Sequence, residues 1–231
     1  MRIDASRALG GYAAAATLAC LWLALGGAAT NDARFRVLDV ERINVREPDG
    51  TLRLTIANSK RQPGLFVGGR ELPHPNRTGA GMIFFNDEGV ENGGLMFDGG
   101  GPQQRAHGGG SLTFDRYRQD QVVQLFSDED GPARQSGVRV FDRPDGAMDL
   151  THASSIVAMP DGAARTAAIT SANLGGQQRG FFGRSDDGSA RLDLRDAAGK
   201  VRLSLRVASD GAAAVEFRDA AGHVTRTMTP D

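Results

Sequence analysis

The pentapeptide Arg-Asp-Ala-Ala-Gly occurs twice near the C-terminus, as Arg195–Gly199 and as Arg218–Gly222, 23 residues apart. Each copy follows a segment in which apolar and charged residues alternate, and the pair Asp210-Gly211 lies between the copies. Alternation with a period of two is the pattern of a β-strand with one apolar face, and Asp-Gly is a favoured hairpin turn. The repeat therefore predicts a chain of β-hairpins. It specifies a scaffold and not a reaction.

The same pattern begins much earlier in the chain. Ile43 and Val45 precede the turn Glu47–Gly50, and alternating Leu52 and Leu54 follow it. We predict further hairpins within 82–97 and 121–141, a short strand at 65–67, and strands across 191–218. Because short turns join neighbouring antiparallel strands, the predicted fold class is mainly β, an antiparallel hairpin meander. Turn glycines recur roughly every 40 residues, as in propeller blades. The sequence leaves open whether the sheet closes as a propeller, a barrel or a sandwich.

Two segments depart from the alternation. Residues 144–176 are rich in alanine, and they predict one or two short helices within 146–172. The glycine runs 99–101 and 108–110 predict a flexible loop around His107. Elsewhere each strand has one apolar and one charged face, so we expect a sheet that is covered on its apolar side and wet on the other.

The N-terminal 30 residues differ in composition from the rest, which predicts a leader at 1–30 and a β-domain at 31–231. Arg2 and Arg7 are followed by an uncharged, Ala- and Leu-rich run over 8–29. This pattern fits a signal peptide cleaved after Ala28 or Ala29, and it equally fits a single transmembrane helix. In both cases we expect the protein at the cell membrane, with its body facing the periplasm or the cell exterior.

Charge and cysteine content narrow the function classes. The net charge is −1 and the arginines are spread among nearly equal numbers of acidic residues, so nucleic acid is not an expected partner. Cys20 is the only cysteine and lies inside the apolar leader, which leaves the body without disulfides or a thiol nucleophile. We find no Walker, Rossmann or Gly-x-Ser-x-Gly motif, so no cofactor is predicted.

The segment 86–92 is the densest polar cluster, and it makes Asn86, Asp87, Glu88, Glu91 and Asn92 candidate ligand-binding residues. Oxygen donors at this density are calcium ligands in other proteins, but the spacing of an EF-hand is absent. Asn, Asp and Gly also form hairpin turns unaided, so a turn is favoured over a metal site and no metal is predicted.

Three residues are weak catalytic candidates: His74, Asp115 and Asp120. His74 lies between Pro73 and Pro75, which would hold it stiffly for acid–base work, although a surface histidine is the simpler interpretation. Paired carboxylates can hydrolyse a glycosidic bond. If residues 115–121 form one strand, however, Asp115 and Asp120 point to opposite faces. An Arg–Asp network beside a packed Tyr117 is then the favoured interpretation.

Three stretches of sequence resemble a family of uncharacterised bacterial proteins. They are DVERINVREPDGTLRL at 39–54, FFNDEGVENGGL at 84–95 and LTFDRYRQDQ at 112–121. The resemblance covers roughly residues 35–143. It implies an N-terminal hydrophobic segment and a β-rich body, and it implies no activity.

These features lead to one main hypothesis and two alternatives. The main hypothesis is an exported, membrane-tethered, non-enzymatic β-domain that binds an envelope protein or glycan through the loops 62–81, 86–92 and 99–110. The first alternative is an envelope hydrolase that uses carboxylates or a loop histidine. The second is a calcium-stabilised structural module. Convergence of the candidate residues on one pocket would favour the hydrolase.

Overall fold

The computed structural model describes residues 5–26, 32–67, 70–72, 74, 77–101 and 106–230. The chain divides into two compact units, Met1–Asp39 and Val40–Asp231. The first unit contains helix α1 (Ala5–Gly26). In the part of the chain that the structure describes, no helix combines the length and the apolar character that a membrane crossing requires. The predicted cleavage positions, Ala28 and Ala29, lie outside the described residues.

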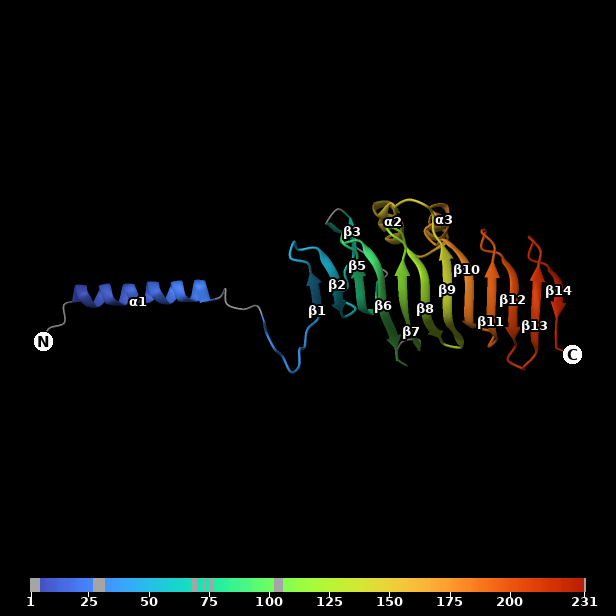
Figure 1. The fold of residues 1–231 in the computed structure, drawn as a ribbon, viewed down its shortest axis with the longest axis horizontal. Coiled ribbons are helices and arrows are strands. Elements are labelled where there is room, and N and C mark those ends of the chain that lie inside the picture. Colours follow the sequence, from blue (N-terminus) through green and yellow to red (C-terminus); the bar gives the residue numbers. More distant parts are fainter. Residues whose placement is uncertain are drawn as a thin grey trace. The chain divides into compact units, whose positions relative to one another are not determined.

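The body is built on one antiparallel sheet of 12 strands that follow one another in chain order (Figure 1). The exception is a separate two-stranded hairpin, β3–β4, inserted between β2 and β5. The prediction of a mainly β hairpin meander is confirmed. The sheet stays open, because β1 and β14 end the strand order, so it forms no propeller or barrel. The strands are β1 (Arg42–Arg46), β2 (Leu52–Ala57), β3 (Leu65–Val67), β4 (Arg70–Leu72), β5 (Ala80–Phe85), β6 (Glu91–Gly100), β7 (His107–Asp115), β8 (Gln121–Asp130), β9 (Ala133–Asp142), β10 (Gln177–Arg184), β11 (Ala190–Arg195), β12 (Val201–Val207), β13 (Ala213–Arg218) and β14 (Val224–Met228).

The repeated pentapeptide forms the same turn twice, on the same edge of the sheet. Gly199 and Gly222 adopt φ values of 76° and 93°, which favour glycine. The register shifts by one residue next to each turn, so each hairpin carries a bulge. Arg195 donates from Nη1 to the Gly199 carbonyl at 3.0 Å, and Arg218 does the same to Gly222 at 3.2 Å. The repeat is therefore a structural unit, as its sequence predicted.

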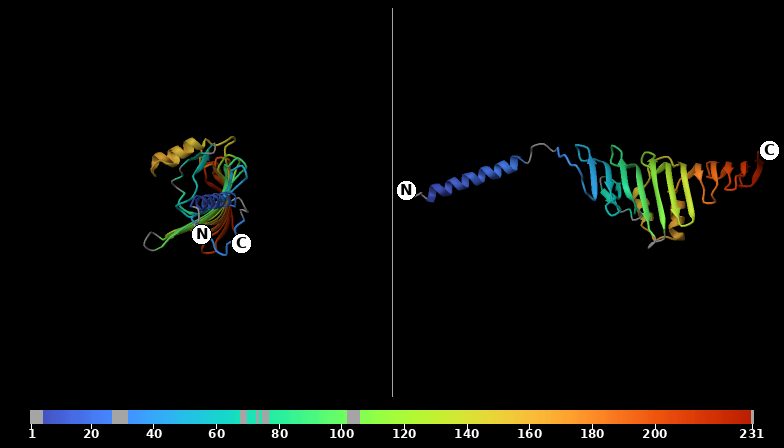
Figure 2. Two further views of the ribbon diagram at one scale, coloured as in Figure 1. Left: turned by 90° about the vertical axis from the view of Figure 1, so that its left-hand side faces the viewer. Right: turned by 90° about the horizontal axis from the view of Figure 1, so that it is seen from below.

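The insertion forms two short helices, α2 (Leu150–Val157) and α3 (Ala163–Ser171), as predicted. The helices and the β3–β4 hairpin lie on one side of the sheet (Figure 2). Phe66 of β3 meets Phe85 edge to face, with 5.4 Å between the ring centroids. Phe85 packs with Leu52 and Ile83 in the buried core.

The sheet has two faces of opposite character. One side chain from each of the 12 strands aligns in an unbroken apolar row across the first face. The apolar row consists of Ile43, Ile56, Met82, Leu95, Leu112, Leu125, Val138, Phe182, Leu192, Leu205, Val215 and Met228. The second face carries the row between Asn44 and Thr227, which includes Thr113, Arg139 and Asp193.

The prediction that the apolar side is the covered side is wrong. Ile83, Phe126 and Phe181, on the second face, are buried. Leu125 and Phe182, in the apolar row, are 52% and 65% exposed. The reason is the placement of the insertion and of β3–β4, whose Phe66 packs against the buried cluster of Leu52, Ile83 and Phe85.

The predicted loop at 99–110 is also largely wrong. Strand β6 continues to Gly100 and β7 begins at His107, with Gly99 paired to Gly108. Residues 102–105 lie outside the described part of the chain. Glycine suits this ladder, because a Cβ on Gly110 would stand 2.7 Å from the Phe97 ring. The glycine runs therefore let an aromatic side chain lie across the neighbouring strand.

Candidate functional site

Four of the predicted site residues line one cavity. His74, Glu91, Asp115 and Asp120 surround a space of 190 Å³ that we call the carboxyl pocket. Glu91 is the first residue of β6, Asp115 is the last of β7, and Asp120 directly precedes β8. Since these strands are antiparallel neighbours, their turns bring the three carboxyl groups to the same edge of the sheet.

Arg77 holds the loop that carries His74 against the sheet. Its Nη1 donates to the Pro63 carbonyl at 2.7 Å, and its Nη2 lies 2.6 Å from Glu91 Oε2. The Arg77 side chain is 10% exposed. The backbone N–H of Arg77 also donates to the His74 carbonyl at 3.1 Å. Arg77 thus holds Glu91 through its guanidinium and His74 through its backbone.

Arg143 performs the same task for Asp120 and for the helical insertion. Its Nη2 lies 3.3 Å from Asp120 Oδ2, and its Nη1 donates to the Leu174 carbonyl at 2.6 Å. Its side chain is 4% exposed. Apolar residues of the insertion, Met148 and Ala153 among them, complete the wall of the pocket.

The environment of the pocket changes the protonation of its members. Burial, together with the charges of Glu91 and Asp120, raises the pKa of Asp115 to about 8. Burial also raises the pKa of Glu91, although Arg77 opposes this. Burial and the nearby Arg77 lower the pKa of His74. At neutral pH the pocket therefore combines a protonated carboxyl with a neutral imidazole.

Two polar atoms in the pocket lack partners. Asp115 Oδ1 and His74 Nδ1 are buried and make no hydrogen bond. Within the described residues they are two of only four such side-chain atoms. A buried polar atom without a partner costs free energy, and natural proteins keep few of them without a functional reason. Both residues line the same cavity.

The pocket opens onto a polar groove on the covered face. A hollow of 400 Å³ shares His74, Arg77 and Glu91 with the carboxyl pocket and continues past Gln124 and Arg139. The guanidinium of Arg139 lies over the Phe126 ring, with Cζ 3.6 Å from its centroid.

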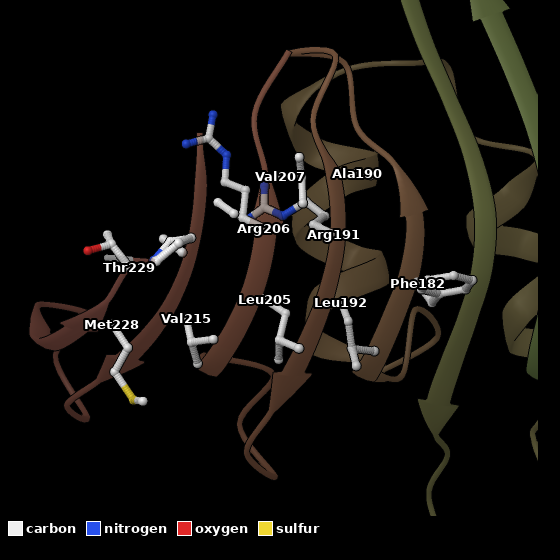
Figure 3. A pocket seen from close by; sticks show the side chains of 13 residues that line it. Phe182, Ala190, Arg191, Leu192, Leu205, Arg206, Val207, Val215, Met228 and Thr229 are labelled. Carbon is white, nitrogen blue, oxygen red and sulfur yellow. The ribbon is translucent and has the colours of Figure 1, made fainter. Parts of the chain in front are cut away.

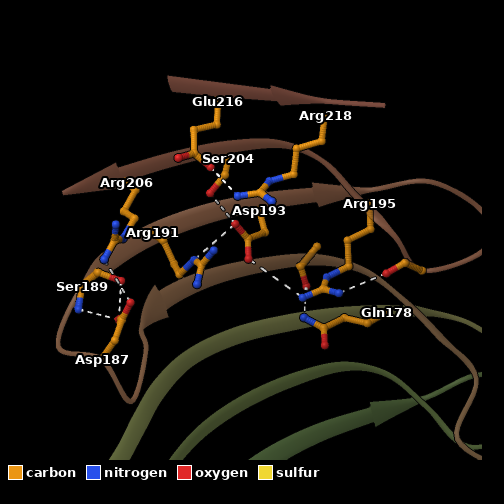
Figure 4. Close-up of polar contacts among 12 residues, drawn as sticks. Gln178, Asp187, Ser189, Arg191, Asp193, Arg195, Ser204, Arg206, Glu216 and Arg218 are labelled. Atoms are coloured by element: carbon orange, nitrogen blue, oxygen red, sulfur yellow. Dashed lines mark hydrogen bonds and ion pairs between the residues drawn. The ribbon is translucent and has the colours of Figure 1, made fainter. Parts of the chain in front are cut away.

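Polar side chains continue beyond the groove across β11–β13 (Figure 4). There Ser204 donates to Asp193 Oδ1 at 2.6 Å, and Arg191 Nε lies 3.3 Å from the same oxygen. Donors and acceptors therefore follow this face over most of the sheet.

The remaining candidates have structural roles around a hairpin turn. Asn86 Oδ1 accepts hydrogen bonds from the backbone of Glu88 and Val90. Asp87 pairs with Arg53. Glu88 accepts from Tyr117 at 2.6 Å and from Arg118 at 2.8 Å, and Asn92 is exposed. Of the five ligand-binding candidates in 86–92, only Glu91 lines the pocket, beside the apolar Val90. No three His, Cys, Asp or Glu residues in the described ranges are grouped as a metal site requires.

Residues 115–121 do not form one strand, so the condition under which Asp115 and Asp120 would point to opposite faces is not met. The segment is a turn closed by the backbone of Arg116 and Asp120, so Asp115 and Asp120 line the same cavity rather than opposite faces. Tyr117 is 60% exposed rather than packed. Arg77 and Arg143 were not predicted as site residues, because a single arginine in a loop carries no local signal.

Comparison with protein-family models and with curated proteins gave no match to this chain. The resemblance to a family of bacterial proteins therefore stays a prediction, and the site rests on its own geometry.

Proposed function

We propose that the body is a non-enzymatic module that binds a glycan, with one sugar end in the carboxyl pocket and the rest of the chain along the polar groove. The observation that carries this proposal is that Asp115 and His74, two residues that line one cavity, each hold a buried polar atom without a partner, Asp115 Oδ1 and His74 Nδ1.

The chemistry of the lining favours hydroxyl groups. A protonated Asp115 both donates and accepts, and a neutral His74 does the same, which matches the two-way bonding of a sugar hydroxyl. Phe66 and Val90 supply apolar wall against which the C–H face of a sugar ring can pack. Ser111, Thr113 and Gln124 line the groove with uncharged donors and acceptors.

The test is calorimetric titration of the full chain with neutral oligosaccharides of cellulose, chitin and starch type. We expect one class to bind, and Asp115→Ala and His74→Ala each to weaken binding at least about tenfold, equal to about 1.4 kcal/mol. Asp145→Ala is the matched control, because Asp145 pairs with Arg116 nearby but is almost fully exposed. The proposal fails if no oligosaccharide binds, or if Asp115→Ala binds like the wild type.

A second candidate is a hydrolase. One observation favours it: an acid protonated near neutral pH, Asp115, shares its pocket with Asp120, which is paired with Arg143. Asp115 would then protonate a leaving group while Asp120 or Glu91 activates water. Turnover of nitrophenyl glycosides or esters that disappears in Asp115→Asn would support this candidate. Unchanged turnover in that variant would remove it.

We further propose that the N-terminal segment exports the body. Support comes from Arg2 and Arg7 before the uncharged run over 8–29. Cell fractionation of the expressed full chain tests this, and recovery of the body from the cytoplasm would contradict it.

A further inference from the structure

No described element covers the apolar row. None of its members is buried, although every one of them is a large apolar side chain. At the C-terminal end of the row, Phe182, Leu192, Leu205, Val215 and Met228 project to one side of the sheet (Figure 3). They line an open hollow of 570 Å³. The exposed fraction is 65% for Phe182 and 48% for Met228.

A second apolar line runs beside this row. It includes Phe84, Phe114, Val140 and Leu194, which are between 42% and 54% exposed. Arg226, opposite Phe217 at the last strand, is the one charge that the described registers place in either line. The apolar surface is therefore continuous across the 12 strands of the sheet.

The opposite face of the same strands is polar, and its side chains bond to one another. Asp193, Ser204 and Glu216 come from positions that alternate with the apolar row, and their hydrogen bonds and ion pairs run between side chains (Figure 4). Glu216 pairs with Arg218 at 2.5 Å, for example. Asp193 and Ser204 are 3% and 1% exposed, so side chains satisfy one another on this face, and of the two faces of these strands only the apolar one lacks a partner.

The size of this face matches a protein interface. Twelve strands spaced about 4.8 Å apart span about 53 Å, and five paired residues at about 3.3 Å each span about 17 Å, which gives about 900 Å². Stable protein–protein interfaces bury about 800 Å² on each partner. Monomeric proteins rarely expose a contiguous apolar patch larger than about 600 Å².

We propose that the apolar face is a homo-oligomer interface, on which the apolar row of a second copy of this chain packs. In the second line Gly93 lies between Phe84 and Phe114, so large and small residues alternate there. Facing sheets interdigitate their side chains about 10 Å apart. A second copy also offers a surface of equal length and equal character.

The test compares two adjacent residues of β8 that point to opposite faces. Leu125→Glu places a charge in the apolar row, and Gln124→Glu places the same charge on the polar face, where Arg139 already contacts Gln124 at 3.4 Å. Light scattering on the full chain at micromolar concentration gives the mass. We expect at least twice the chain mass for the wild type and for Gln124→Glu, and the mass of one chain for Leu125→Glu.

Folding is followed by circular dichroism in the same samples. If Leu125→Glu does not fold, Leu205→Glu, at a residue that is 42% exposed, takes its place. A monomeric wild-type protein overturns the proposal. This holds whether native mass spectrometry finds the monomer without a ligand or with lipid bound to it. The proposal also fails if the oligomer persists in both Leu125→Glu and Leu205→Glu. The test is independent of glycan binding, since the carboxyl pocket lies on the other face.

Discussion

Asp115 should make the protein less stable as the pH rises. Its pKa is 3.8 in an unfolded chain and about 8 in the folded protein. Below the unfolded value both states are protonated, so the group favours neither. Between the two values only the unfolded state ionises, and stability falls by about 1.4 kcal/mol per pH unit until it levels off above about pH 8. Replacing Asp115 with Asn removes this dependence while keeping shape and one donor.

The magnitude follows from the same two values. The gap between 3.8 and about 8 sets an upper limit of about 6 kcal/mol. We expect about half of that, because a buried carboxylate draws in water and the surrounding structure relaxes. Asp115→Asn should therefore gain about 2 to 3 kcal/mol over the wild type as the pH rises from about 5 to about 8.

Urea unfolding of both proteins across that pH range measures the difference. The contributions of Glu91 and His74 are present in both proteins and largely cancel. Asp145→Asn is the control, since Asp145 is an exposed carboxylate near the same sheet edge. Parallel pH profiles for Asp115→Asn and the wild type would refute the assignment of a buried, protonated Asp115.

Three further predictions follow from the fold. Arg77→Ala leaves Glu91 buried without its partner, so it should lower the free energy of unfolding in urea by about 3 kcal/mol. The control Arg61→Ala, at an exposed ion pair, should lower it by less than about 1 kcal/mol, and equal losses would contradict the prediction. Gly137→Ala should cost about 2 kcal/mol or more, because φ is 154° and the new Cβ would stand 2.2 Å from the Phe182 carbonyl oxygen, whereas Gly175→Ala has open space; a melting temperature like that of Gly175→Ala would be the contrary result. Calcium or chelator should leave the melting temperature unchanged, because Asn86 and Glu88 are engaged within the protein; a rise with calcium would restore the calcium-stabilised module.

Local chemistry made the strands and turns predictable. The alternation around Gly50, Gly199 and Gly222 predicted hairpins, and hydrogen bonds between neighbours suffice to form them. The alanine-rich insertion likewise gave two helices, because helix propensity acts over a few residues. The glycine runs led to the wrong prediction of a loop. Glycine makes a loop flexible, but here it also leaves room for the Phe97 side chain to lie across the neighbouring strand.

The candidate site was predictable only in part. His74, Glu91, Asp115 and Asp120 were singled out by residue type, but their convergence depends on a turn at 116–120 and on the loop that Arg77 fixes. The two arginines that organise the pocket act across 14 and 23 residues, on Glu91 and on Asp120 respectively. The alternation of residue types within one strand carries no information about contacts between residues so far apart.

The amino-acid order alone determined that this chain pairs its strands with their neighbours and keeps apolar and polar side chains on separate faces. Both properties follow from the two-residue period of a strand and from short turns. Tertiary structure decided which face the insertion and β3–β4 cover, and with it the burial that gives Asp115 its altered pKa and leaves the apolar row exposed. Burial depends on what packs above a residue, and that neighbour comes from a distant part of the chain.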